Sequence, residues 1–394
     1  MAISNSSSQY GEVAKVFHWT TAILILILMP LGMMANNAPF ETSEQLTNKA
    51  WLFSLHKTLG VAVFFVALLR ILWALTQSKP APLHPENKLE TFAAEVAHWL
   101  LYGSLVLVPL SGWIHHAATT GFAPIWWPFG QNLPFVPKDE GVAHLFGNMH
   151  WIWTKLLLAA LLAHIAGALK HVVVDRDATL RRMWFGTIGN LRVPAVAHKV
   201  AVPAAVAMVL FVASGVASGM GQDTKPEVAP TSLQAATSQW QVLEGNIEIT
   251  ITQFGNRVTG SFDEWTSSIE FDPETGLGSV ETTIAIGSLT LGSVTDQAMG
   301  ADFFNVDSFP TATYVADIAP TEIGYIASGT LTVRGVSVPV ELPFGLELGA
   351  GDAQMSGSAS VRRLDFGVGA SMPDETNLGF DVDISINLVA TLSQ

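Results

Sequence analysis

The stretch that decides the fold of the first half is residues 150–171, which read HWIWTKLLLAALLAHIAGALKH. Its ionisable residues are two lysines and three histidines, and at about 1.5 Å of rise per residue it can cross a hydrocarbon core of about 30 Å. His150 and His164 are 14 residues apart, which is close to four helical turns and about 21 Å of rise. We therefore expect both rings on one face of a single membrane helix, at opposite depths.

The sequence contains five comparable apolar runs, which predict five membrane-spanning helices. In chain order they lie at 17–35, 51–75, 92–117, 151–174 and 200–219. The first four runs carry embedded His, Lys or Arg, whereas the fifth carries no ionisable residue. Basic Arg192 and Lys199 before it and small residues after it are typical of an internal signal sequence. Two interpretations stay open: an uncleaved anchor, which we favour, or a cleavage site that frees the second half.

The charges divide the chain into two modules. Residues 1–220 hold 14 Lys+Arg and 10 Asp+Glu, and residues 221–394 hold 5 and 23, so the net charges are +4 and −18. All 11 histidines lie between His18 and His198, so any histidine chemistry belongs to the first module. The chain has no cysteine, which excludes iron–sulfur clusters, c-type haem attachment and disulfides. The strongly acidic second module argues against nucleic-acid binding.

Basic residues predict the orientation of the helices. One set of loops carries Lys15, Lys79, Lys88 and the basic residues of 176–199, whereas the opposite loops carry Lys49 and Lys138 beside several carboxylates. The N-terminus is therefore expected inside, and five crossings place residue 220 onward outside. We predict a multi-pass protein of the bacterial inner membrane with a cytoplasmic N-terminus and a periplasmic C-terminal domain.

Four histidines pair by their expected depth. His18 and His164 fall near the inner face, and His56 and His150 near the outer face. Two facing imidazoles at each level are what two stacked b haems need, because neutral imidazole is a good ligand for iron and bundle cores hold such ligands. The alternative for an intramembrane histidine is a hydrogen bond between helices, and His98, His115, His116 and His144 are candidates for it, at loops or helix interfaces.

The motifs around these histidines are FHW (17–19), SLHKTLG (54–60), Arg70, AHWLLYGSLVLVPLSGW (97–113) and LKHVVVDRDATLRRM (169–183). They resemble the bacterial cytochrome b561 family over about 10–185. The resemblance implies a four-helix di-haem b cytochrome that passes electrons between the outer surface and the quinone pool; some members are superoxide:ubiquinone oxidoreductases. It gives His18, His56, His150 and His164 as the axial ligands of the haem irons. His171 and Arg70 could contact a quinone carbonyl or a haem propionate.

The second half alternates apolar with small or polar residues at 247–252, 282–291, 312–319, 327–342 and 380–392, which predicts an antiparallel barrel or sandwich. Residues 221–239 form a Pro-containing linker before it. No catalytic constellation is present, since His and Cys are absent here. An apolar barrel could hold a lipophilic ligand. The candidate lining residues are Phe254, Phe262, Trp265, Phe303, Phe304, Phe309 and Tyr314, and packing in the core is the alternative for each.

Three segments, ADFFNVDSFPTATY (301–314), SGTLTVRGVSVPVELPF (328–344) and SASVRRLDFGVG (358–369), resemble the YceI-like family over about 240–392. The resemblance implies a lipocalin-like β-barrel that encloses an isoprenoid chain, such as that of a quinone. Histidines that are common in the early strands of that family are missing here.

The whole sequence therefore predicts a multi-domain membrane protein: an all-α transmembrane di-haem four-helix bundle with a fifth helix, then an all-β lipocalin-like antiparallel barrel. The expected boundaries are 10–185 for the cytochrome, 195–220 for the fifth helix, 221–239 for the linker and 240–394 for the barrel. The expected function is electron transfer through two haem b between a periplasmic-side donor, for which superoxide is the candidate, and ubiquinone. The alternatives are a cytochrome b subunit of a separate dehydrogenase, or a lipid-carrier barrel with the membrane half as its anchor.

Overall fold

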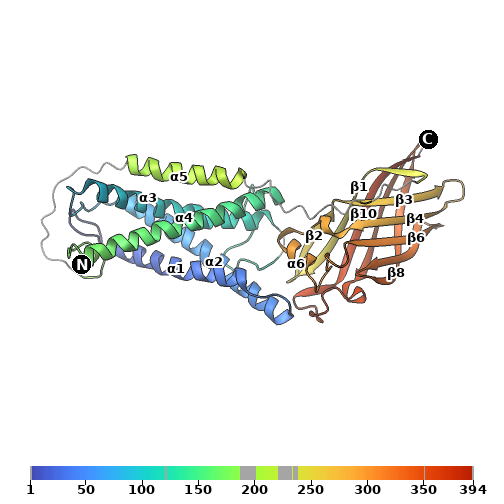
Figure 1. The fold of residues 1–394 in the computed structure, drawn as a ribbon, viewed down its shortest axis with the longest axis horizontal. Coiled ribbons are helices and arrows are strands. Elements are labelled where there is room, and N and C mark those ends of the chain that lie inside the picture. Colours follow the sequence, from blue (N-terminus) through green and yellow to red (C-terminus); the bar gives the residue numbers. More distant parts are fainter. Residues whose placement is uncertain are drawn as a thin grey trace. The chain divides into compact units, whose positions relative to one another are not determined.

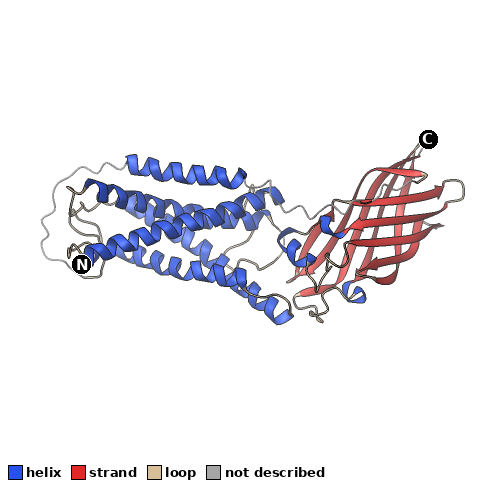
Figure 2. Ribbon diagram, in the orientation of Figure 1, coloured by secondary structure: helices blue, strands red, loops and turns tan. Residues whose placement is uncertain are grey.

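The computed structural model describes residues 2–119, 122–186, 201–220, 233, 238–349 and 351–392. The chain forms two compact units, one helical and one rich in β-strands (Figure 2). Of the predicted linker 221–239, all but residues 233, 238 and 239 lie outside the described residues, as do residues 195–200 of the predicted fifth-helix segment. Each unit is described by itself below.

The helical unit contains five long apolar helices, as the sequence predicts (Figure 1). They are α1 (Glu12–Asn37), α2 (Ser43–Leu75), α3 (Lys88–Ala118), α4 (Glu140–Val173) and α5 (Ala201–Met220). The start of α4 is fixed by its sequence, because the Asp139 side chain accepts a hydrogen bond of 2.8 Å from the Val142 backbone N–H. By length and hydropathy each of the five can cross a membrane. A short 3-10 turn, η1 (Leu180–Arg182), follows α4.

The fifth helix packs against α3 and α4 (Figure 1). The Phe211 ring of α5 lies so close to the α3 backbone that a Cβ at Gly103 would come within 2.4 Å of it. Trp153 of α4 donates its indole N–H to Ser214 Oγ at 3.1 Å, and its ring meets Phe211 edge-on at 6.2 Å. Because glycine and hydroxyl contacts of this kind drive helix association in membranes, α5 is an integral part of the bundle rather than a loose tether.

The β-rich unit is a closed antiparallel barrel. Among the described residues its strands are β1 (Trp240–Gln253), β2 (Asn256–Phe262), β3 (Trp265–Asp272), β4 (Leu277–Ala285), β5 (Leu289–Thr290), β6 (Thr311–Thr321), β7 (Gly324–Val333), β8 (Val336–Leu348), β9 (Asp352–Arg362) and β10 (Leu378–Leu392). The ring runs β1-β10-β9-β8-β7-β6-β4-β3 and closes through β3 and β1, while β2 and β5 extend outward from β1. This arrangement confirms the predicted barrel and excludes an open sandwich.

Short helical segments interrupt the barrel: η3 (Ile286–Ser288), η4 (Gly292–Val294), α6 (Thr295–Met299) and η5 (Arg363–Phe366). The apolar interior is centred on Trp240, Phe271, Tyr314, Leu331 and Phe344. The period-two segment 327–342 is not one strand: it is the hairpin β7–β8, which turns at Arg334 (φ 52°) and Gly335 (φ 73°). Two successive left-handed residues match the twist of the flanking strands, which is why a two-residue turn forms here.

Candidate functional site

The first histidine pair joins His56 of α2 to His150 of α4. We call it the outer pair after its predicted depth. The ring centroids are 6.3 Å apart, and the ring planes are nearly perpendicular at 88°. His56 Nδ1 lies 3.1 Å from Leu28 O, and His150 Nδ1 lies 2.9 Å from Val108 O. A carbonyl only accepts hydrogen bonds, so each ring carries its proton on Nδ1 and keeps the lone pair of Nε2 available.

Two glycines leave the space that these rings occupy. A Cβ at Gly32 of α1 would lie 2.8 Å from His56 Cε1, and a Cβ at Gly112 of α3 would lie 2.9 Å from His150 Nδ1. Both distances are shorter than a normal carbon contact, so any other residue would push the ring aside. The rings of the outer pair therefore occupy space that is open only because residues 32 and 112 are glycine. We call this space the glycine cradle.

The second pair joins His18 of α1 to His164 of α4, and we call it the inner pair. Its ring centroids are 6.2 Å apart with the planes inclined at 60°. Arg70 of α2 lies beside it: its guanidinium donates to Thr21 Oγ1 at 2.6 Å and approaches His18 Nδ1 at 3.5 Å. His98 of α3 also faces this pair, with its ring centroid 5.1 Å from that of His164.

The two spacings fit a shared iron. A metal–imidazole bond is about 2 Å long, and the ring centre lies roughly 1.2 Å behind its nitrogen, so two imidazoles that share one iron have centroids up to about 6.4 Å apart. The outer and inner pairs, at 6.3 Å and 6.2 Å, match this separation. The contact between His98 and His164, at 5.1 Å, is too short for it. The donor set, neutral nitrogen from opposite helices, also suits haem iron.

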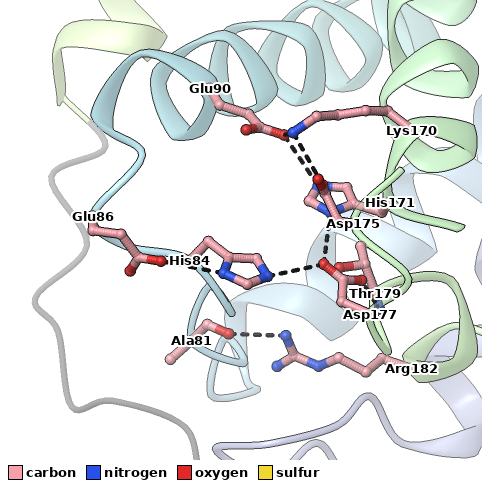
Figure 3. Close-up of polar contacts among 10 residues, drawn as sticks. All are labelled: Ala81, His84, Glu86, Glu90, Lys170, His171, Asp175, Asp177, Thr179 and Arg182. Atoms are coloured by element: carbon pink, nitrogen blue, oxygen red, sulfur yellow. Dashed lines mark hydrogen bonds and ion pairs between the residues drawn. The ribbon is translucent and has the colours of Figure 1, made fainter. Parts of the chain in front are cut away.

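His171 belongs to a different group of polar residues near the end of α4 (Figure 3). Its Nδ1 donates to Asp177 Oδ2 at 2.8 Å and lies 3.0 Å from Asp175, and its Nε2 lies 3.6 Å from Glu90. His84, from the connection between α2 and α3, points Nε2 toward the same Asp177 oxygen at 3.2 Å. Both ring nitrogens of His171 are therefore surrounded by carboxylates, and the structure does not bring this residue together with Arg70.

Two features define the electrostatics of this group. Burial alone would raise the pKa of the Asp177 carboxyl, but hydrogen bonds from Thr179 and His171 outweigh burial and hold this pKa below its usual range. Glu90, His171 and Asp175 converge closely enough to hold a metal ion. However, the Lys170 ammonium already contacts Glu90 and lies 3.0 Å from Asp175, so an internal cation takes the place that a metal would occupy.

The sequence analysis missed His84, Glu90, Asp175 and Asp177 as partners of His171. They come from separate segments, and only the spacing H-x3-D-x-D at 171–177 could have drawn attention to two of them. A carboxylate four residues after a histidine at a helix end is a natural hydrogen-bond partner.

Two apolar cavities lie in the described part of the β-rich unit. The larger, about 90 Å³, is lined by residues that include the predicted Tyr314, and also Trp240, Phe271 and Phe344, which the sequence analysis had not singled out for ligand contact. The smaller, about 60 Å³, is lined by residues that include the predicted pair Phe303 and Phe304 together with Leu46 of α2.

The other four predicted residues lie elsewhere. Phe262 packs into the core beside Phe304, and Trp265 packs over Gly245. Phe254 lies in a cluster with Met372 and Leu378, and Phe309 lies against Gly335.

Paired histidines inside a membrane helix bundle, joined to a closed barrel with an apolar interior, define a membrane cytochrome of the b type with a lipid-binding barrel. The family model "Prokaryotic cytochrome b561" matches residues 9–186, and the model "YceI-like domain" matches residues 224–390. The chain belongs to the prokaryotic cytochrome b561 family and carries a YceI-like domain at its C-terminal end.

Individual relatives match one half each. Cytochrome b561 homolog 2 of Escherichia coli (strain K12) is 30% identical over 187 residues, which cover 46% of this chain and 95% of that protein. Probable superoxide oxidase CybB of Yersinia pestis is 24% identical, over 44% of this chain and 95% of that protein. Among solved structures, Burkholderia cenocepacia BcnA is 29% identical over 37% of this chain and 96% of its own, with a TM-score of 0.36. Campylobacter jejuni YceI is 23% identical over 34% and 85%, with a TM-score of 0.31.

The family and the five apolar helices make this a bacterial membrane protein of electron transfer, with b haem as its cofactor and a barrel of the isoprenoid-binding type.

Proposed function

We propose that the protein passes electrons through two b haems from a donor at the outer face to ubiquinone. His56 and His150 would hold one haem iron, and His18 and His164 the other. The observation that carries this proposal is the matched spacing of the two pairs, 6.3 Å and 6.2 Å. Bound haem supplies reversible one-electron chemistry. Each pair would hold its iron with two imidazoles, which would leave the iron to carry electrons rather than to bind oxygen.

The inner pair requires a change of proton position when iron binds. Arg70 only donates, so in the structure His18 Nδ1 accepts from it at 3.5 Å. A histidine that binds iron through Nε2 carries its proton on Nδ1 and can no longer accept there. Ligation would therefore release one Arg70 N–H, which then suits a quinone carbonyl or a haem propionate. This supports the assignment of Arg70 to such a contact. The carboxylates around His171 give it a different role, argued in the next section.

The donor we favour is superoxide. It is a one-electron donor, so two superoxide ions would supply the two electrons that reduce one quinone. A relative that shares the cytochrome half, from Yersinia pestis, is described as a probable superoxide oxidase. A cytochrome b subunit that serves a separate dehydrogenase is the alternative, and it differs in needing a protein donor.

We further propose that the barrel holds an isoprenoid quinone or a related isoprenoid lipid. Both of its described cavities are apolar, at about 90 Å³ and 60 Å³, and the larger is lined by residues of the barrel strands. A random coil as long as the predicted linker 221–239 spans on the order of 25 Å, a length that would keep the barrel close to the membrane. We place the domain boundaries at 10–185, 195–220, 221–239 and 240–394.

The orientation is part of the proposal. Loop charges favour an inside N-terminus and a periplasmic barrel. Protease added to intact spheroplasts is expected to cut within 221–239 and to release a β-rich fragment. A fragment that is protected until the membrane is opened would reverse the topology.

The main experiment is purification in mild detergent, followed by a redox-difference spectrum, haem quantification as the pyridine haemochrome, and mass spectrometry of co-extracted lipid. We expect two b haems per chain and an isoprenoid quinone that is lost when residues 240–394 are deleted. One haem per chain, or a His164→Ala protein with its full haem content, would refute the ligand assignment. A protein without a haem spectrum would favour the lipid carrier with a membrane anchor.

A further inference from the structure

We propose that His84, Asp177 and His171 form a proton relay that delivers the protons needed to reduce quinone on the side of the inner pair. This inference rests on the proposed function, since quinone reduction takes up two protons with two electrons. The residues come from the α2–α3 connection, the end of α4 and the segment after it, and Figure 3 shows the Asp177 carboxylate between the two imidazoles.

One carboxylate oxygen faces both rings. Asp177 Oδ2 accepts from His171 Nδ1 at 2.8 Å and lies 3.2 Å from His84 Nε2. The second oxygen of Asp177 accepts from the Thr179 backbone N–H at 2.7 Å, so the carboxylate cannot turn away. The two rings are parallel within 7°, with centroids 6.4 Å apart. His84 Nε2 is buried and makes no hydrogen bond among the described residues. Since it faces the same Asp177 oxygen, a small rotation of the His84 ring would join the two imidazoles through a single fixed acceptor.

The chain of groups leads from solvent inward. Glu86, whose side chain is 67% exposed, contacts His84 Nδ1 at 3.2 Å, whereas Asp177 is only 11% exposed. Beyond Asp177, the His171 side chain is 20% exposed and turns its Nε2 toward Glu90 of α3. Exposure thus falls from Glu86 to Asp177, as a path for proton uptake requires, and rises again to 34% at Glu90 on the far side of His171.

The charges of the group leave room for two protons. Among the residues drawn in Figure 3, the carboxylates of Glu86, Glu90, Asp175 and Asp177 face two fixed cations, Lys170 and Arg182. With neutral imidazoles the group carries two unbalanced negative charges. Two protons taken up by the group would therefore not give it a net positive charge. That number equals the protons that one quinone consumes.

The position along α4 connects the relay to the electron path. His171 is seven residues after His164, about two helical turns and roughly 10 Å of rise, so it lies on nearly the same face. Arg182, beside the group, donates to Ser8 O at 2.7 Å, which puts the relay at the membrane face of the N-terminal segment. Loop charges assign this face to the inside.

The reaction balances as follows. Two electrons and two protons convert the two quinone carbonyls to hydroxyls; two O–H bonds form, and one N–H bond of each imidazolium breaks. Water reprotonates the pair through Glu86 and His84. No additional oxidant or reductant is needed.

The test measures oxidation of the dithionite-reduced, full-length protein by a short-chain ubiquinone in detergent, in stopped flow. The variants are His84→Gln/His171→Gln and, separately, Asp177→Asn, which keeps the size of the side chain. We expect haem content and spectra to remain those of the wild type, while quinone-dependent oxidation slows by about tenfold to a hundredfold and acquires a larger solvent deuterium isotope effect. Added imidazole should restore the rate of the double variant, whereas sodium chloride at equal ionic strength should not.

His144→Gln, an exposed histidine in the first turns of α4, is the matched control and should behave as the wild type. Wild-type rates in the double variant would overturn the relay. So would a slow variant that imidazole does not rescue, because a purely structural ion-pair group would give that result. A wild-type protein whose haems quinone fails to oxidise would overturn the proposed function itself, and the relay with it.

Discussion

The two histidine pairs have the same spacing but different surroundings. In the outer pair both Nδ1 atoms face backbone carbonyls, those of Leu28 and Val108, and glycines at 32 and 112 make room for the rings. In the inner pair His18 Nδ1 faces the Arg70 guanidinium, and a third histidine packs against His164. The outer site is fixed by backbone, whereas the inner site is set by side chains that can move or change partners.

This difference has an electronic consequence. A hydrogen bond from Nδ1 to a carbonyl makes an imidazole a more basic ligand, which stabilises ferric iron. A nearby guanidinium instead disfavours the extra positive charge of ferric iron. We therefore expect the outer site to have the lower reduction potential, so that electrons run from the outer to the inner pair. This direction agrees with a donor outside and quinone reduction at the inner face.

The largest effect is expected from His56→Ala, which removes one ligand of the outer pair only. Haem content should fall from two per chain to one, and the remaining haem should keep the spectrum and potential of the inner site. Pyridine haemochrome analysis with a redox titration measures both.

His144→Ala, at an exposed position outside both pairs, should keep two haems. If His56→Ala retained two haems, or lost both, the two pairs would not be separate sites.

The next effect tests the glycine cradle. Gly112→Ala places a Cβ 2.9 Å from His150 Nδ1, the atom that bonds Val108 O. The ring has to move, at a cost of about 1–3 kcal/mol, so we expect weaker haem retention and a shifted spectrum at the outer site. Alanine favours helix more than glycine does, so a loss cannot come from the helix itself.

Gly167→Ala is the matched control, because nothing lies within 4 Å of its Cβ position. Equal haem retention in the two alanine variants would show that the cradle is unimportant. Among the described residues no glycine lies this close to either ring of the inner pair. Gly112→Ala should therefore change the outer site and leave the inner site as in the wild type.

The same residues show how much of the site could be predicted from the sequence. The 14-residue spacing of His150 and His164, together with the order of the apolar runs, was enough to predict which histidines come together. The carbonyl partners could not be predicted, because they depend on how each helix is rotated about its axis. Likewise, the partners of His171 come from a connecting segment and another helix, and a local pattern does not show where such segments return.

The barrel shows a second reason for missed features. Strand β9 (Asp352–Arg362) was not predicted, because its sequence DAQMSGSASVR is rich in Ser, Gly and Ala and has little apolar contrast between its two faces. Strands β7 and β8 were recognised as one alternating segment because Arg334–Gly335 is a short turn that hardly interrupts the period of two. Strand pairing, rather than local composition, defines both features.

A smaller effect is expected from Arg70→Gln, which removes the cation beside the inner pair without touching a ligand. At an effective dielectric of about 20, two unit charges about 10 Å apart interact by on the order of 1–2 kcal/mol, and the Arg70 guanidinium lies 3.5 Å from His18 Nδ1. The inner potential should therefore fall by on the order of 50–100 mV, while the outer potential and the haem content stay the same. Arg70→Lys, which keeps the charge, should recover most of the shift. An unchanged inner potential would remove the electrostatic difference between the sites.

The smallest effect tests whether the position of Arg70, and not only its charge, matters. Thr21 Oγ1 accepts from the Arg70 guanidinium at 2.6 Å while donating to the backbone oxygens of Phe17 and His18 at 2.8 and 2.9 Å. Thr21→Val keeps the shape of this buried side chain but removes the oxygen that holds the guanidinium beside His18. The arginine should then sample positions farther from the inner pair. We expect the inner potential to fall by on the order of 20 mV, a fraction of the Arg70→Gln shift.

Thr20→Val, at the exposed neighbouring position, is the control and should leave both potentials unchanged. If adding Thr21→Val to Arg70→Gln lowered the inner potential further, this explanation would be contradicted, because the hydroxyl would then act on the site without the arginine.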